Sequence, residues 1–180
     1  VLGASVSPSD FDENGECYYL SMATIKNWMF ERENAQTVSN SYVNNNLVKT
    51  IKNGDIILAR SGEGTIGKVA LIEDSNVRAV FADFTMRIRL KEYNAKFAYY
   101  YMRSTYFQYL VEIYKKGLGN NTNIFPIAVR ELPLIDISLS EQERIVKEIQ
   151  TEIDKQNATK NQISLLREQI DKIIVDTIIS

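Results

Sequence analysis

The chain has 180 residues, a formal net charge of −2 and an apolar fraction of 44%, which together are typical of a folded domain with its own core. A single cysteine, Cys17, and no histidine exclude an internal disulfide and weaken most hydrolase and metalloenzyme hypotheses, because histidine is the commonest general base and metal ligand. No stretch approaches the roughly 18 apolar residues of a membrane helix, and the first residues lack the pattern of a signal peptide, so we expect a cytoplasmic protein with no membrane association.

The first 139 residues predict a single α+β unit. Four runs have the composition of strands: CYYLSM (17–22), GDIILAR (54–60), GKVALIE (67–73) and RAVFADFTMRIRL (78–90). The polar stretch SNSYVNNN (39–46) predicts a loop between the first two. The following segment, NAKFAYYYMRSTYFQYLVEIYKKG (94–117), predicts one helix that Asn94 caps and Gly117 ends.

The chain changes character near ELPLIDISLSEQERIV (131–146), after which it has no Gly or Pro and is rich in helix-forming residues. Ser140 and Glu143 form the S-x-x-E pattern of a capping box, which predicts that a helix starts there. If this helix runs to about Thr177, it is roughly 55 Å long at 1.5 Å per residue. Because usual helices have three or four turns, a helix of this length needs a partner.

Apolar residues recur along this predicted helix at the spacing of a coiled-coil seam. They are Ile145, Ile149, Ile153, Ile163, Leu166, Ile170 and Ile173. Polar residues such as Gln156 and Asn161 interrupt the seam, and they either disfavour wrong registers or mark a place where the helix leaves its partner. The alternative is a long helix folded back on its own domain. We predict two units, a globular domain at residues 1–139 and a dimerisation helix at residues 140–180.

The run ARSGEGTIGKVALIE (59–73) contains two phosphate-binding patterns. Its three glycines spell GxGxxG, and Gly62 to Lys68 spell GxxxxGK. Both patterns need a helix after the last glycine, and the second also needs Ser or Thr after the lysine. Here Val69 follows and strand-forming residues continue, so the run predicts a β-hairpin and not a nucleotide site.

The tip of this hairpin has a composition that suits contact with nucleic acid. Glycines allow close approach of the backbone, hydroxyls and amides can meet phosphate oxygens, and cations can reach phosphates or guanine edges. The candidate residues are Arg60, Ser61, Gly62, Gly64, Thr65 and Lys68. The alternative is that the glycines serve only tight turns and a bulge, while both cations are solvated.

A second candidate loop, KKGLGNNTNIF (115–125), follows the predicted helix of residues 94–117. Asn can meet adenine with two hydrogen bonds and Lys can meet guanine or phosphate. The candidates in this loop are Lys115, Lys116, Asn120, Asn121 and Asn123. Residues 49–139 carry thirteen Lys or Arg against nine Asp or Glu, an excess that is compatible with a polyanion-binding face but also ordinary for a solvated surface. No carboxylate has a companion nucleophile or metal set, so a catalytic role has little support.

Taken in order, these features resemble the specificity (S) subunit of type I restriction-modification systems. Three segments carry the resemblance: NGDIILARSGEGTIGKVALIE (53–73), GLGNNTNIF (117–125) and VRELPLIDISLSEQERIVKEI (129–149). The third matches the family's passage from a target recognition domain into a conserved helix, although Asp136, Ile137 and Ser138 replace its usual prolines. The resemblance covers about residues 15–180.

The resemblance implies a non-catalytic subunit. Its α+β target recognition domain, with a strongly bent β-sheet and short helices, would read one half of a split site in double-stranded DNA, and its helix would pair with a second copy as an antiparallel coiled coil. Methyltransferase (M) and restriction (R) subunits would dock on this scaffold. S-adenosylmethionine would bind the methyltransferase, so this chain would need no cofactor. The family usually has two such units, so the resemblance indicates a half-size or truncated form whose homodimer reads inverted repeats.

Two hypotheses from other classes remain. One is a coiled-coil protein-interaction module without DNA binding, which would bind a protein partner with an affinity insensitive to salt. The other is a nucleotide-binding enzyme, which ATP or NAD would protect against thermal unfolding.

Overall fold

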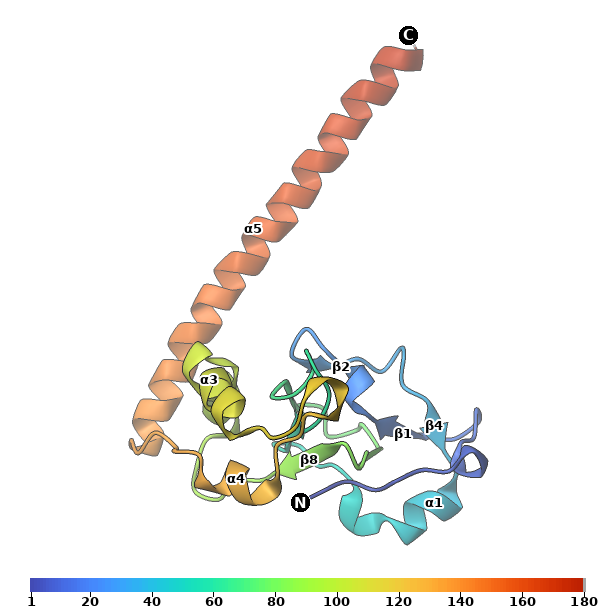
Figure 1. The fold of residues 1–180 in the computed structure, drawn as a ribbon. Coiled ribbons are helices and arrows are strands. Elements are labelled where there is room, and N and C mark those ends of the chain that lie inside the picture. Colours follow the sequence, from blue (N-terminus) through green and yellow to red (C-terminus); the bar gives the residue numbers. More distant parts are fainter. Residues whose placement is uncertain (180) are drawn as a thin grey trace. The chain divides into compact units, whose positions relative to one another are not determined.

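The computed structural model describes residues 1–179, apart from the side chains of Asn120 and Ile179 (Figure 1). Contacts divide the chain into two compact units, Val1–Leu139 and Ser140–Ser180. The first unit combines sheets and helices, and the second is a helix. The predicted α+β class with a long C-terminal helix is therefore confirmed, whereas the antiparallel coiled coil stays a prediction.

The strands of the first unit form two three-stranded sheets and one hairpin. In chain order they are β1 (Cys17–Leu20), β2 (Ile25–Lys26), β3 (Met29–Phe30), β4 (Thr37–Val38), β5 (Ile56–Ala59), β6 (Val69–Leu71), β7 (Ala79–Phe81) and β8 (Thr85–Ile88). One sheet has the order β4–β1–β7, in which β1 is antiparallel to β4 and parallel to β7. The other has the order β6–β5–β8 and is antiparallel throughout, so the predicted hairpin around the glycine loop is present.

The predicted single strand at residues 78–90 is wrong, because the chain turns between β7 and β8. The backbone N–H and the hydroxyl of Thr85 both donate to the carbonyl of Ala82, at 2.9 and 2.7 Å. The carboxylate of Asp83 accepts from the backbone N–H of Phe84 at 2.9 Å. These local bonds stabilise a turn and compete with extended pairing. The strands on either side therefore join different sheets, and the strand system bends there.

The predicted single helix at residues 94–117 is also wrong, because it is two helices, α2 (Ala95–Arg103) and α3 (Thr105–Tyr114). Asn94 caps the first as predicted, since its side chain accepts from the backbone N–H of Phe97 at 2.9 Å. Ser104 has an extended backbone, with φ −65° and ψ 151°, and its side chain accepts from Phe107 N–H at 3.2 Å. Ser104 therefore ends one helix and caps the next.

The polar stretch at residues 39–46 contains a short helix, α1 (Asn40–Asn45), where a loop was predicted. Ser39 caps it by accepting from the backbone N–H of Tyr42 at 3.2 Å, and Tyr42 and Val43 are buried. Burial of two apolar side chains outweighed the low helix propensity of the asparagines. The remaining short elements are α4 (Pro126–Glu131), η1 (Pro8–Asp10), η2 (Met22–Thr24), η3 (Leu47–Lys49) and η4 (Gly119–Asn121).

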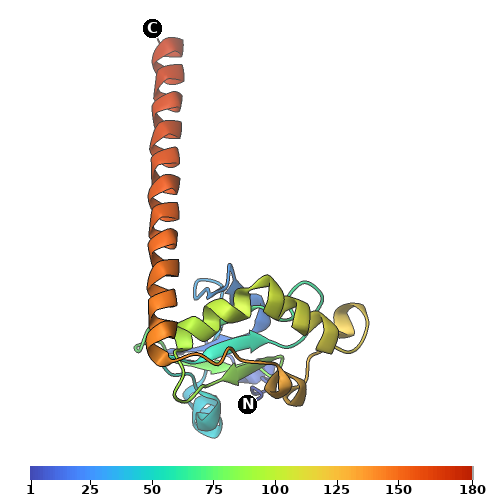
Figure 2. The ribbon, with the colours of Figure 1, turned by 90° about the vertical axis from the view of Figure 1, so that its left-hand side faces the viewer.

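Helices α2 and α3 lie across one face of the β6–β5–β8 sheet (Figure 2). The core between them combines residues from every one of these elements. Its fully buried members include Leu58, Val69, Met86, Ala98, Phe107 and Val111. This packing holds the end of β5, where the glycine loop begins, on a rigid base.

The second unit consists of α5 (Leu139–Ile179), a helix of 41 residues, from its second residue onward. The helix begins at Leu139, one residue before the predicted start at Ser140. Arg144 forms ion pairs with Glu141 and Glu148 on this helix, at the spacings that support an exposed helix. Within residues 1–179, no helix is apolar over a stretch long enough to cross a membrane.

A buried carboxylate fixes the start of β5. Asp55 is 1% exposed, and its oxygens accept from Arg89 Nε at 2.7 Å, from Arg89 Nη2 at 2.8 Å and from the backbone N–H of Lys52 at 2.7 Å. The bonds to Asp55 raise the pKa of Arg89 above the usual arginine value. This bidentate pair ties β8 to the turn before β5.

We expect Asp55→Ala to lower the free energy of unfolding by about 2 to 4 kcal/mol, because it removes a buried, hydrogen-bonded ion-pair partner. Chemical denaturation measures the change. Glu16→Ala is the control, since Glu16 pairs with Arg78 at the surface, where the two side chains are 78% and 55% exposed. Its effect should stay below about 0.5 kcal/mol. Equal losses in the two variants would show that Asp55 does not anchor the strand.

Candidate nucleic-acid interface

The structure brings the two candidate loops together, although they lie far apart in the sequence. We call residues 60–68 the glycine loop and residues 115–123 the lysine-asparagine loop. Gly62 N–H donates to the carbonyl of Thr122 at 3.1 Å, and Ile124 N–H donates to the carbonyl of Arg60 at 2.9 Å. These bonds flank an antiparallel bridge between Ser61 and Asn123. The two loops therefore form one surface.

The glycine loop is built on left-handed backbone positions. Gly62, Gly64 and Gly67 have φ values of +84°, +74° and +84°, which favour glycine. Gly67 is also packed closely, because a Cβ there would lie 2.8 Å from Gln108 Oε1. A strand, β6, follows the loop, so the helix that both nucleotide-binding patterns require after the last glycine is replaced by a strand.

Three candidate side chains are engaged in contacts within the protein. Ser61 is 5% exposed and its hydroxyl donates to the carbonyl of Thr122 at 3.3 Å. The hydroxyl of Thr65 donates to the carbonyl of Ser61 at 2.7 Å. Lys115 forms an ion pair with Glu112 at 2.5 Å. These three candidates therefore have structural contacts, which the sequence did not indicate.

The remaining candidates are more accessible. Gly64, Lys116 and Asn121 are exposed and Lys68 is half-buried, while the side chain of Asn120 lies outside the described residues. No described carboxylate lies within ion-pair distance of Lys68 or Lys116. These two cations are therefore available to a polyanion.

Arg60 lies where the loops meet and is fixed from several sides. Its Nε donates to the carbonyl of Asp83 at 2.9 Å, and its Nη1 donates to Asn123 Oδ1 at 3.4 Å. Its guanidinium carbon lies 5.8 Å from the centroid of the Phe84 ring. The turn between β7 and β8 thus adds Asp83 and Phe84 to the site. Neither residue was a candidate from the sequence, because this turn was predicted as the middle of a strand.

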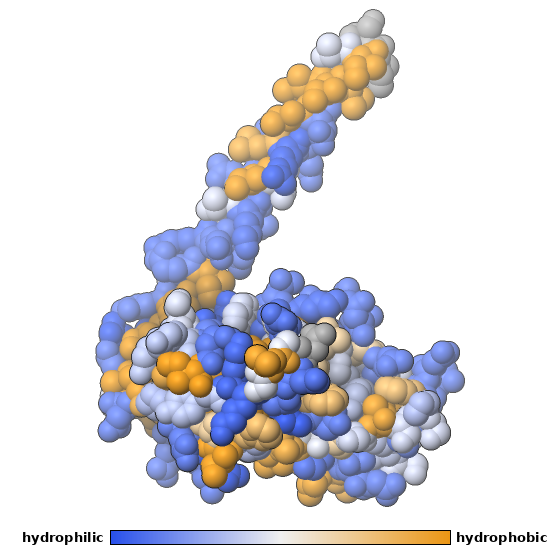
Figure 3. Space-filling model, in the orientation of Figure 1, coloured by the Kyte–Doolittle hydropathy of each residue, from blue (hydrophilic) through white to orange (hydrophobic). Residues whose placement is uncertain are grey.

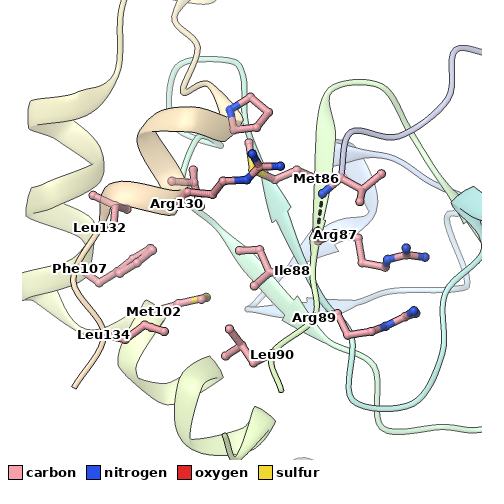
Figure 4. A pocket seen from close by; sticks show the side chains of 13 residues that line it. Met86, Arg87, Ile88, Arg89, Leu90, Met102, Phe107, Arg130, Leu132 and Leu134 are labelled. Carbon is pink, nitrogen blue, oxygen red and sulfur yellow. Dashed lines mark hydrogen bonds between the residues drawn. The ribbon is translucent and has the colours of Figure 1, made fainter. Parts of the chain in front are cut away.

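A cavity of about 370 Å³ lies apart from this surface, between α4, β8 and the α2–α3 pair (Figure 4). Its walls are mainly apolar and include Met86, Ile88, Phe107 and Leu132. Its described titratable side chains are those of Arg87, Arg89 and Arg130. A cavity without a carboxylate or a nucleophile offers no acid–base pair for catalysis.

A metal centre is likewise missing from residues 1–179, in which no three His, Cys, Asp or Glu side chains lie close enough to hold an ion. The one thiol, Cys17, is buried, and burial raises its pKa. A buried thiol with a raised pKa is a poor nucleophile.

The seven predicted seam residues all lie on α5, and apolar side chains gather along its C-terminal half (Figure 3). Ile163, Leu166, Ile170 and Ile173 are between 46% and 66% exposed. Leu165, Ile174 and Val175 are exposed as well, so the apolar surface is wider than the predicted seam. A surface of this kind on a helix marks an interaction site.

No family model matches the sequence, and no curated protein matches it. Solved structures do match. The chain is similar to the S subunit of a type I restriction-modification system from M. genitalium, with 20% identity and a TM-score of 0.59 over 93% of this chain and 40% of that chain. It is also similar to an HsdS subunit from Thermoanaerobacter tengcongensis, with 14% identity and a TM-score of 0.61 over 89% of this chain and 42% of that one.

A third similar chain belongs to a structure that concerns complex assembly and conformational transition of the type I R-M system, with 17% identity and a TM-score of 0.59 over 89% of this chain and 43% of that one. These likenesses establish the fold, which is that of type I specificity subunits. The resemblance predicted from the sequence is confirmed at this level. The chain spans about two fifths of the length of the chains that it matches.

Gly117 offers a test of the lysine-asparagine loop. Its φ is +105°, and a Cβ would lie 2.4 Å from the backbone carbonyl oxygen of Asn121. We expect Gly117→Ala to destabilise the protein by about 2 kcal/mol or more, because backbone strain and a clash add. Gly64→Ala is the matched control, since Gly64 has φ +74° but nothing within 4 Å of a Cβ; it should cost about 1 kcal/mol. Thermal unfolding compares the two, and a smaller loss for Gly117→Ala would contradict the described loop.

Proposed function

We propose that this chain is a non-catalytic, sequence-specific DNA-binding subunit of a type I restriction-modification system. In this role it reads one half of a bipartite target and provides a scaffold for the methyltransferase and restriction subunits. The observation that carries the proposal is the joining of the glycine loop and the lysine-asparagine loop into one cationic surface on the fold of type I specificity subunits.

The chemistry of the joined loops suits double-stranded DNA. Lys68 and Lys116 can neutralise phosphates, and Gly64 lets the backbone approach closely. Arg60 presents a fixed guanidinium, which suits a base edge or a phosphate with two acceptors. Phosphate contacts would position the domain and base contacts would give the sequence preference.

The same proposal assigns α5 to dimerisation and to subunit docking. Pairing two copies would bury the exposed side chains of Ile163, Leu166 and Ile170. Two helices related by a two-fold axis that is perpendicular to them run antiparallel. A helix of 41 residues spans roughly 60 Å, which is enough to separate two reading domains by more than one turn of DNA, about 34 Å. Identical readers related in this way would select inverted repeats.

The reaction itself would belong to the partners. Methylation of a base within a duplex requires that the base be flipped into an enzyme pocket. The methyltransferase subunits would supply that pocket together with S-adenosylmethionine. The part played by this chain would be to hold them over a chosen sequence.

We expect Lys116→Ala and Lys68→Ala each to weaken binding to a random-sequence duplex and to reduce the slope of log affinity against log salt by about one. Fluorescence anisotropy at several salt concentrations measures this, with the full chain alone and with the methyltransferase subunit added. Lys155→Ala is the control, because Lys155 is paired with Glu152 on α5 and its loss should leave the slope unchanged. Salt-insensitive binding to a protein, with no retention on DNA, would favour the interaction module instead.

We also expect Leu166→Glu to convert a dimer of the full chain into monomers, because a carboxylate in the seam would be buried without a partner. Sedimentation equilibrium measures the mass. Ser164→Glu adds the same charge on a part of α5 that faces away from the seam, and it should leave the dimer intact. A monomeric wild-type chain at concentrations up to about 100 µM, where associations of typical affinity form, would count against the homodimer.

A further inference from the structure

Among the described residues, the acceptors that hold the Arg60 side chain are all neutral. Its Nε donates to the carbonyl of Asp83 and its Nη1 to the amide oxygen of Asn123. The carboxylate of Asp83 is occupied elsewhere, because it accepts from Ser5 Oγ and from Phe84 N–H, each at 2.9 Å. The guanidinium is therefore oriented by the protein without being neutralised by a carboxylate.

The rest of the guanidinium remains available to a ligand. Arginine has five donors, and no described residue accepts a hydrogen bond from Arg60 Nη2. Arg60 itself is half-buried, and its backbone is locked by bonds from its N–H to the carbonyl of Phe84 at 3.0 Å and from Ile124 N–H to its own carbonyl. A side chain fixed before binding loses little entropy on binding, which favours tight and directional contacts.

Asn123 already uses both ends of its side-chain amide. Its Nδ2 donates to the carbonyl of Asn121 at 2.9 Å, and its Oδ1 accepts from Arg60. Reading an adenine would need both groups at once. Asn123 is therefore placed to orient Arg60, in contrast to the adenine contact that its residue type indicated in the sequence.

We infer that Arg60 is the base-reading residue of this surface, that it selects a guanine in the half-site, and that Asn123 positions it. The inference rests on the proposed function. Guanine presents O6 and N7 as two acceptors side by side in the major groove, which matches the planar fork of arginine. Lys68 and Lys116 are flexible point charges that suit phosphates, so the fixed fork is the group suited to a base edge.

The test is a selection of DNA duplexes from a randomised pool by the full chain in complex with its methyltransferase subunit. We expect the wild-type complex to enrich a motif that contains a required guanine. Arg60→Lys should reduce the preference for guanine at that one position by about tenfold or more, since a good bidentate contact discriminates by this order, while the other positions stay enriched. Arg60→Ala should do the same. Lys116→Ala should weaken the recovery of all sequences and leave the motif unchanged.

A second variant separates positioning from fold. Asn123→Ser keeps the arginine at position 60 but removes the amide that holds its Nη1. The preference for the same guanine should therefore fall, while the thermal unfolding temperature stays close to that of the wild type. A motif that keeps its guanine in the Arg60 and Asn123 variants, with only a uniform loss of affinity, would assign Arg60 to a phosphate and overturn the inference. A wild-type complex that enriches no motif would overturn the proposed function itself, and the inference with it.

Discussion

The antiparallel bridge between Ser61 and Asn123 is the constraint on which the site depends. It joins two loops whose side chains would otherwise be placed independently, and the buried hydroxyl of Ser61 adds a bond across the junction. Arg60 precedes this bridge and takes its side-chain orientation from Asn123 on the other loop. Gly117 permits the return of the second loop, since a Cβ at this position would meet the backbone of Asn121. The placement of the candidate side chains is thus tied to the backbone geometry of the two loops.

Some local signals in the sequence predicted local structure correctly. The hairpin of β5 and β6 follows from strand-forming residues around glycines, and the cap at Asn94 follows from one side chain and a nearby N–H. The break at Ser104 was missed because a serine within a helical pattern becomes a cap only if the backbone leaves the helical conformation there. Packing of the two helices against the sheet decides this, and the local sequence does not show it. Both loops were found as separate candidates. Their junction was not predictable, because the residues that meet are 61 and 63 positions apart and non-local pairing leaves no periodic trace.

The residue types in the loops predicted the polar character of the surface, but they did not predict which side chains support the loops and which are accessible. Serine and threonine often contact DNA phosphates. Here the hydroxyls of Ser61 and Thr65 instead donate to backbone carbonyls of the protein. A buried hydroxyl must have such a partner, because leaving it unsatisfied costs about 1 to 3 kcal/mol. Asp83 is the opposite case. It was not a candidate from the sequence, yet its backbone carbonyl orients Arg60. Burial and hydrogen-bond demand decide which polar residue builds the site and which one faces the ligand.

At 14% to 20% identity the fold is retained while the sequence is largely replaced. This is understandable if the domain serves as a rigid base for variable loops, since a core tolerates hydrophobic exchange as long as volume and pattern are kept. Loops carried by such a base can change their readout without loss of the fold. The same separation would extend to α5, because the proposed pairing requires only apolar residues at repeating positions. Under the proposed function, a chain built in this way could acquire a new DNA preference by changing a few loop residues, while the surfaces that its partners need would remain the same.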